Sequence, residues 1–157
     1  MPREYLPAEE SSTKTMKVFL IEKDQDNAPY IKCTFISLDE FAKTPYYEHV
    51  FTASKVGQIK PGSIVSIDEN FKNITKLNYS NSYQLGVVLG NHEGVLYVYD
   101  KKNGNQIIDT NHYVTPYAKY SGRGDKVLLN KSDKGTWYIA HNITMAKMKY
   151  ELNQLTR

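Results

Sequence analysis

The 157-residue sequence has a single cysteine, no long apolar run and no apolar segment near its start. One thiol, Cys33, excludes an internal disulfide and fits a reducing compartment. No apolar stretch approaches the roughly 18 residues that a membrane-spanning helix needs. The polar opening Met1-Pro2-Arg3-Glu4 does not resemble a signal peptide. We therefore expect no membrane association and a cytoplasmic protein, or one in a virion assembled there.

Arginine is also scarce. Only Arg3, Arg123 and Arg157 stand beside 17 lysines, in a total of 20 basic residues. The planar guanidinium reads phosphates and base edges through paired hydrogen bonds, whereas lysine acts as a point charge. The scarcity of arginine argues against sequence-specific reading of DNA.

No pattern of reactive residues predicts a catalytic or metal site. Metal ligands need set spacings, and the histidines are dispersed, at His49, His92, His112 and His141. Asp109 and His112 are close in sequence, but such a pair at a strand end is more typical of a turn. Cys33 lies on the apolar side of a predicted strand, so we expect a buried, unreactive thiol. We predict a non-enzymatic protein without metal, cofactor or small-molecule substrate.

The residues that are present are those of one globular domain. Hydrophobic residues make up 40% and charged residues 24%, and the 13 tyrosines suit both half-buried strands and contact surfaces. Charge is unevenly spread. Residues 1–100 hold 10 Lys/Arg against 13 Asp/Glu, a net charge of −3, and residues 101–157 hold 10 against 4, a net charge of +6. The basic C-terminal part permits an anionic partner without requiring one.

Alternating apolar residues separated by glycine- and asparagine-containing turns predict short antiparallel strands. The predicted strands are Met16–Glu22, Tyr30–Ile36, Tyr46–Ala53, Ile64–Asp68, Tyr83–Leu89, Val95–Tyr99, Gln106–Asp109, Lys126–Asn130 and Thr136–Ala140. The capping-box pattern Ser37-Leu-Asp-Glu40 predicts a short helix to Lys43. Residues 70–82 are expected to form a long loop. From Asn142, apolar residues at helical spacing predict a C-terminal helix capped by Asn142 or Thr144.

These elements predict a mainly β protein, a small antiparallel barrel or sandwich of OB-like or SH3-like type, with a short internal helix and a C-terminal helix. The expected organisation is an extended arm over 1–14, one β-barrel domain over 15–141 and an amphipathic helix over 142–157.

Two segments, Lys60–Asp68 and Gln84–Leu89, resemble the first strands of SH3-like barrels, including the MazF/PemK toxin endoribonucleases. That resemblance implies a ribonuclease as a third, distant hypothesis. The family uses an arginine after the first strand, and this sequence has none between Arg3 and Arg123. No catalytic residue is therefore transferred.

Our first hypothesis is a structural or assembly protein that docks to other protein subunits, with a virus or phage particle as the expected setting. Arms and amphipathic helices commonly dock neighbouring subunits. The candidate partner-binding residues lie in the arm and on one stripe of the C-terminal helix: Tyr5, Leu6, Met145, Met148, Leu152 and Leu155.

The alternative is a protein that binds single-stranded nucleic acid, because rings interleave with cations in the basic part of the chain. Such proteins stack bases on aromatic side chains beside a cationic groove. The candidate residues are Tyr113, Tyr117, Lys119, Tyr120, Arg123, Lys126, Lys131, Lys134, Trp137 and Tyr138.

Overall fold

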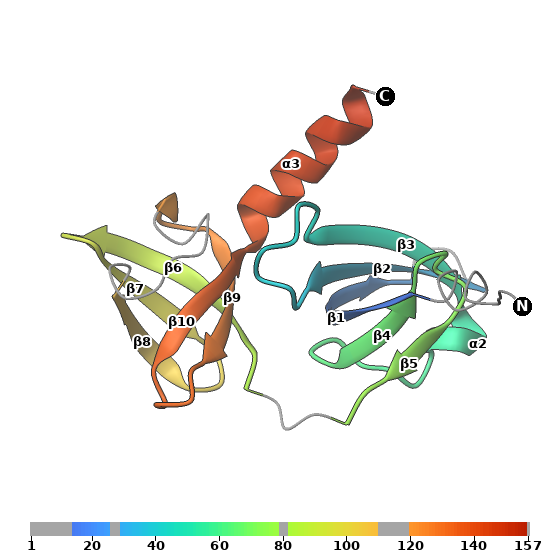
Figure 1. Ribbon diagram of the computed structural model, residues 1–157, viewed down its shortest axis with the longest axis horizontal. Coiled ribbons are helices and arrows are strands. Elements are labelled where there is room, and N and C mark those ends of the chain that lie inside the picture. The colour runs from blue at the N-terminus through green and yellow to red at the C-terminus, as the bar shows by residue number, and fades with distance from the viewer. Residues whose placement is uncertain (1–13, 26–28, 79–81, 110–119, 157) are drawn as a thin grey trace, which may run out of the picture. The chain divides into compact units, whose positions relative to one another are not determined.

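The computed structural model describes residues 14–25, 29–78, 82–109 and 120–156. The chain divides into two compact units. Unit 1 comprises Met1–Ser37 and Tyr47–Tyr79, and unit 2 comprises Leu38–Tyr46 and Ser80–Arg157. Each unit contains one five-stranded antiparallel sheet (Figure 1).

The sheet of unit 1 has the strand order β3-β2-β1-β4-β5. A short helix, α2, follows β3. The Lys23 amine donates to the carbonyl oxygens of Val56 and Ile59, at 2.9 and 2.8 Å, and so ties the end of α2 to β1. The elements are β1 (Thr15–Asp24), β2 (Tyr30–Ser37), β3 (Tyr46–Thr52), α2 (Ala53–Val56), β4 (Ile64–Asp68) and β5 (Ile74–Lys76).

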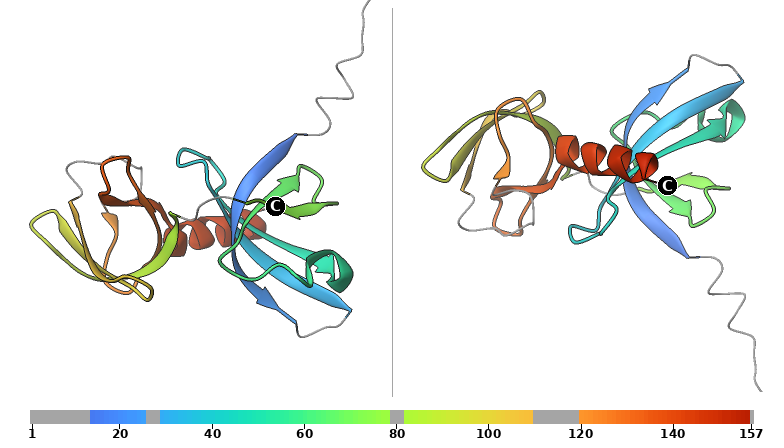
Figure 2. Two further views of the ribbon diagram at one scale, coloured as in Figure 1. Left: turned by 90° about the horizontal axis from the view of Figure 1, so that it is seen from below. Right: turned by 90° about the horizontal axis from the view of Figure 1, so that it is seen from above.

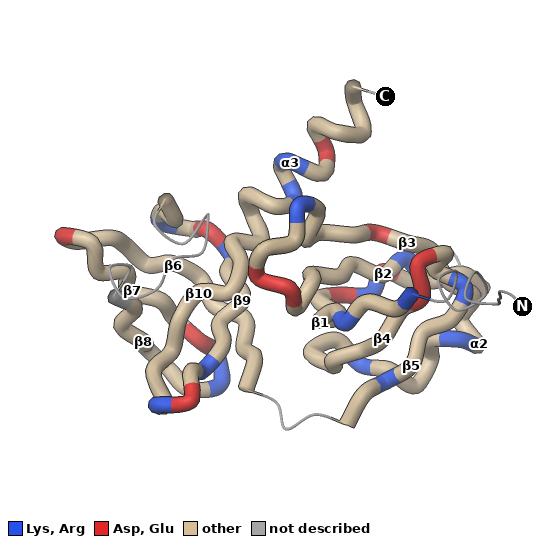
Figure 3. Tube along the Cα trace, in the orientation of Figure 1, with Lys and Arg blue, Asp and Glu red and all other residues tan. Residues whose placement is uncertain are grey.

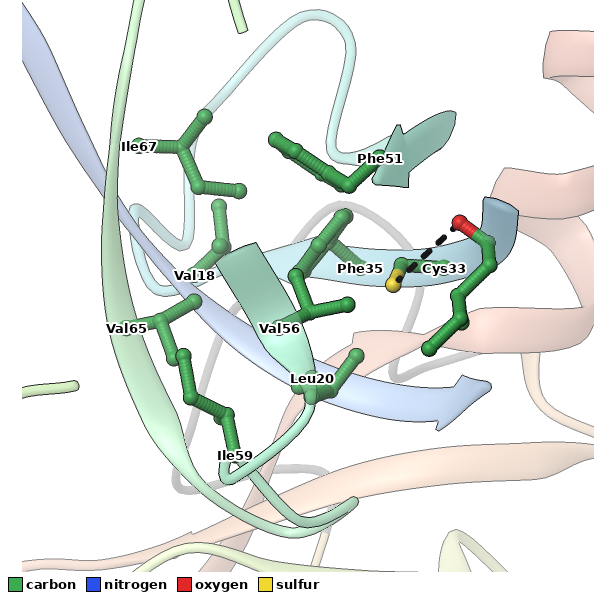
Figure 4. Close-up of a cluster of buried hydrophobic side chains, with 10 residues drawn as sticks. Val18, Leu20, Cys33, Phe35, Phe51, Val56, Ile59, Val65 and Ile67 are labelled. Atoms are coloured by element: carbon green, nitrogen blue, oxygen red, sulfur yellow. Dashed lines mark hydrogen bonds between the residues drawn. The ribbon is translucent and has the colours of Figure 1, made fainter. Parts of the chain in front are cut away.

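The core of unit 1 is formed by the apolar residues that alternate along its strands. Val65 and Ile67 on β4 are fully buried, as their spacing predicts. Phe35 meets Phe51 edge to face, with ring centroids 6.1 Å apart. Figure 4 shows these side chains gathered in one cluster with Cys33 and with Val56 of α2. The predicted buried position of Cys33 is confirmed.

The sheet of unit 2 has the order β10-β9-β6-β7-β8. Its strands are β6 (Gln84–His92), β7 (Val95–Asp100), β8 (Gly104–Asp109), β9 (Lys126–Lys131) and β10 (Trp137–Asn142). The turn between β6 and β7 has positive φ at both Glu93 (52°) and Gly94 (80°), the backbone that a tight hairpin requires. The predicted three-strand meander and the predicted hairpin that follows it are therefore both present.

Both sides of this sheet are buried in part, because Leu128 of β9, the partner of Leu85, is fully buried on the side opposite the main apolar cluster of unit 2. The main cluster lies on one side of the sheet. It is formed by Val88, Leu96, Val98, Ile108, Val127, Leu129 and Ile139, with Trp137 packed against it. Figure 2 shows that the strands twist strongly and that the sheet of each unit curves. The chain ends with helix α3 (Ile143–Leu155), which confirms the predicted C-terminal helix.

Three expectations need correction. Residues 15–141 hold two five-stranded sheets in two units, and neither sheet closes into the predicted barrel. The loop expected over 70–82 contains the short strand β5, which pairs with β4. The helix expected over 37–43 is absent from the structure: Ser37 ends β2, and residues 38–45 form turns and irregular backbone.

Contacts with distant residues explain why the capping box forms no helix. The Asp39 carboxylate accepts a hydrogen bond from the Phe41 amide at 3.0 Å, which makes a turn two residues long. Glu40, the expected reciprocal cap, instead accepts from the Tyr138 hydroxyl at 2.6 Å. His141 Nε2 hydrogen-bonds to the Asp39 carbonyl oxygen at 2.9 Å. Segment 38–46 is thereby held within unit 2.

Candidate functional site

Helix α3 begins at a hydrogen-bonded network that fixes its position on unit 2. The buried Asn142 side chain accepts from the Met145 amide at 3.0 Å and donates to Ser121 Oγ and Asp125 Oδ2, at 3.0 and 2.9 Å. Thr144 Oγ1 accepts from the Lys126 amide at 2.8 Å. Of the two predicted caps, Asn142 is the one that caps the helix.

The first turns of α3 pack within unit 2 through one face. Ile143 and Ala146 are buried, and the Tyr150 ring meets the Tyr46 ring edge to face at 5.3 Å. These three helix residues are spaced three and four apart, so they share a face. Figure 1 shows the helix continuing from β10 and extending beyond the sheet of its own unit.

A second apolar stripe lies on a different side of α3. At 100° per residue, the stripe of Met145, Met148, Leu152 and Leu155 is turned roughly half a revolution from the packed face. Met148 is 58% exposed, Leu152 60% and Leu155 80%, while Met145 is partly buried. The four residues predicted to bind a partner are thus on one helix side, and three of them are largely exposed.

An apolar surface that the sequence analysis missed covers the outer side of β6, β7 and β8. We call it the β6–β8 face. The register places Val87 beside Tyr99, and Tyr97 beside Ile107. The exposed fractions run from 37% at Leu85 to 65% at Ile107. The face consists of Leu85, Val87, Leu89, Tyr97, Tyr99 and Ile107.

The sequence did carry a signal for this face. A strand with one solvent-exposed side normally alternates apolar and polar residues. In Leu85-Gly-Val-Val-Leu89, by contrast, the residues at both odd and even positions are apolar. Alternation predicted the buried residues of these strands, and the apolar residues at the other positions were the signal for the exposed face.

The basic and aromatic residues proposed for nucleic acid are brought together only in part. Lys131 Nζ lies 5.6 Å from the centre of the Trp137 ring. Trp137, however, packs against the core of unit 2, so its ring is only partly accessible. Lys126 and Lys131 stand at opposite ends of β9, about 17 Å apart for a strand of that length. Lys134 lies in the turn beside Lys131.

Two other rings of that set differ in their surroundings. Tyr120 is 70% exposed beside the loop that holds Arg123, which is also exposed. The Tyr138 hydroxyl donates to Glu40 and accepts from Asn130 Nδ2 at 2.8 Å. Burial, followed by the hydrogen bond to Glu40, raises the pKa of Tyr138 far above its usual value. The Tyr138 hydroxyl is therefore already hydrogen-bonded within unit 2.

Several predicted site residues fall outside the described part of the chain. They are Tyr5 and Leu6 of the arm, and Tyr113, Tyr117 and Lys119 of the nucleic-acid set. His112, the partner considered for Asp109, also lies outside it.

The groups available for chemistry within the described residues are dispersed. Burial raises the pKa of the Cys33 thiol to about 11, against a smaller lowering effect of Lys23, so the thiol stays protonated near neutral pH and is a poor nucleophile. His49 stacks on Phe71, with ring centroids 4.7 Å apart, and burial lowers its pKa. Over residues 14–25, 29–78, 82–109 and 120–156, no three His, Cys, Asp or Glu side chains cluster as metal ligands would.

Comparison with known proteins gives no assignment: no family model and no curated protein sequence matches this chain. None of the helices in the described ranges combines the length and apolar character needed to cross a membrane. The function is therefore inferred from the chain's own residues.

Proposed function

We propose that the protein is a non-enzymatic structural or assembly component that docks to another protein subunit through the apolar stripe of α3. The observation that carries the proposal is the exposure of Met148, Leu152 and Leu155 on the side of the helix that its own unit does not cover. Full burial of a Leu or Met side chain is worth about 1.5–3 kcal/mol. A partner that covers this stripe would gain a large part of its binding energy there.

The outer part of α3 supports the same proposal. Residues 151–156 are all exposed, so the last turns of the helix have little packing within the chain. A helix of 13 residues is marginal in water without tertiary packing. Apolar residues at i, i+3, i+7 and i+10 are the pattern by which a helix occupies a groove on another protein. The setting in a virus or phage particle stays a prediction.

The alternative, binding of single-stranded nucleic acid, has weaker support. A cationic groove must follow the backbone beside the stacking rings, whereas the described lysines of β9 lie at its two ends and Trp137 packs inward. The ribonuclease hypothesis has no set of described residues to support it. Docking to protein is the function that the geometry favours.

Site-specific photo-crosslinking in the native cells tests the proposal. A photoreactive residue at Leu152 is expected to give a discrete crosslinked product with another protein, because position 152 would lie within the interface. The matched control is the same residue at Gln154, which is exposed but lies off the stripe. Equal crosslinking from 152 and 154, or none from either, would contradict the proposal.

A further inference from the structure

A small pocket lies within unit 2, between helix α3 and the segment that leads into β3. It is lined by residues 43–46 of that segment and by residues of α3 from Ala146 to Asn153. Its volume is about 170 Å³, below the roughly 300–1,000 Å³ of a typical small-molecule site. The pocket therefore has room for the end of one side chain and not for a larger ligand.

The buried and exposed lining residues of this pocket differ in chemistry. Pro45, Tyr46 and Ala146 are buried and give it a largely apolar wall. None of the described residues that line the pocket is an Asp or a Glu. Its exposed lining residues are all polar: Lys43, Thr44, Lys149 and Asn153. Two ammonium groups, a hydroxyl and a carboxamide thus stand at its open side without a carboxylate among them.

The two lysines of the pocket lack an acidic partner within the described ranges. Neither Lys43 nor Lys149 forms an ion pair with an Asp or Glu there. The acids nearest Lys43 in sequence are engaged elsewhere. Glu40 accepts from the Tyr138 hydroxyl, and Glu48 is paired with a lysine of β2. The pocket therefore presents positive charge that the described part of the chain does not neutralise.

The two flanks of the apolar stripe differ in charge. Lys149 lies on the flank that lines the pocket. On the other flank, Lys147 and Glu151 are four residues apart, so their opposite charges are neighbours on the helix surface. Figure 3 shows basic positions on α3 and on the segment before β3, with an acidic position farther along the helix. The pocket flank is thus the positive side of the stripe.

We propose that this pocket binds an Asp or Glu side chain of the subunit that docks on α3, an inference that rests on the proposed function. Lys149 borders both features. At 100° per residue it lies about 40° from Met145 and about 60° from Leu152 around the helix, and it also lines the pocket. A partner that covers the stripe therefore brings its own side chains to the pocket, where a carboxylate would meet the two ammonium groups. Exclusion of water from such an interface strengthens this attraction.

The surroundings favour a protein carboxylate over a nucleic-acid phosphate. Nucleic acid needs a row of cations along its backbone, whereas the pocket offers two lysines next to the exposed Met148, Leu152 and Leu155. An apolar core bordered by polar and charged groups is the arrangement of a protein–protein interface. The inferred partner therefore has an apolar groove with an acidic residue on one rim, and this residue sets the direction in which α3 lies in the groove.

Carbodiimide crosslinking of the assembly isolated from the native cells tests this inference. The reagent joins a lysine amine directly to a carboxylate that touches it, without a spacer. We expect mass spectrometry to find Lys43 or Lys149 joined to an Asp or Glu of another chain. Lys147, exposed on the same helix but outside the pocket, is the matched control and should give no such product. Products at Lys147 as abundant as those at the pocket, or none at Lys43 and Lys149, would overturn the inference.

Charge reversal separates this inference from the proposed function. With a photoreactive residue at position 152, Lys43→Glu combined with Lys149→Glu is expected to lower crosslinking to the partner by roughly tenfold, because acidic groups would then face one another. Lys147→Glu should crosslink like the unchanged chain. All three lysines are exposed, so the changes should leave the fold intact. Undiminished crosslinking in the double variant would overturn the pocket alone, whereas no crosslinking from position 152 in the unchanged chain would overturn both proposals.

Discussion

Asn142→Ala is expected to lower the free energy of unfolding by about 2–4 kcal/mol. The substitution removes the helix cap on Met145, worth about 1 kcal/mol. It also removes the part-buried hydrogen bond to Asp125 and leaves the buried Ser121 hydroxyl without its amide donor, and losing a partner of a buried polar group costs about 1–3 kcal/mol. Urea unfolding followed by far-ultraviolet circular dichroism measures the difference.

Asn142→Asp separates the cap from the rest of the network. The carboxylate of the variant can still accept from the Met145 amide. Its second oxygen would take the place of Asn142 Nδ2, which in the wild type lies 2.9 Å from Asp125 Oδ2. Two carboxylates at that distance resist simultaneous ionisation. This variant should therefore be least stable near neutral pH and should recover part of its loss as the pH is lowered.

Asn153→Ala, at an exposed position of the same helix, should change the stability by no more than about 0.5 kcal/mol. Equal stability of Asn142→Ala and Asn153→Ala would show that the network at the start of α3 does not hold the helix on unit 2.

Gly86→Ala is expected to cost about 1–3 kcal/mol, whereas Gly90→Ala on the same strand should be neutral or slightly stabilising. A Cβ atom at Gly86 would lie 2.6 Å from Val98 Cγ1 and 3.2 Å from the Tyr99 carbonyl oxygen. Val98 is fully buried and β-branched, so it cannot move aside cheaply. At Gly90 no atom lies within 4 Å of the added carbon.

The pair is measured by thermal unfolding, with Trp137 fluorescence reporting on the core of unit 2 against which this ring packs. A loss at Gly90 as large as that at Gly86 would contradict the packing described for β6 and β7, because the two substitutions add the same methyl group.

The strands were predictable from the sequence because their signals are local. Val65 and Ile67 alternate with polar residues, and Gly94 and Gly104 stand at turns where φ is positive. The start of α3 was predictable for the same reason, since Asn142 needs only the Met145 amide three residues ahead to cap the helix.

The remaining features depend on distant contacts, which local patterns do not report. The Glu40 carboxylate accepts a hydrogen bond from Tyr138, 98 residues further along the chain, so it does not complete the capping box and no helix forms there. The division into two units could not be predicted from local patterns. Segment 38–46 connects β2 and β3 of the sheet in unit 1, but it belongs to unit 2. The stripe of α3 was predictable from its spacing, but its exposure depended on which helix face packs within unit 2.

Hydrogen exchange at the amides of Leu152–Leu155 tests docking through α3 most directly, by comparing the purified protein with the assembly isolated from its cells. We expect rapid exchange in the purified protein, where these turns have little packing, and slow exchange once a partner covers the stripe. Equally rapid exchange in both states would show that α3 stays uncovered in the assembly and would contradict the proposed function.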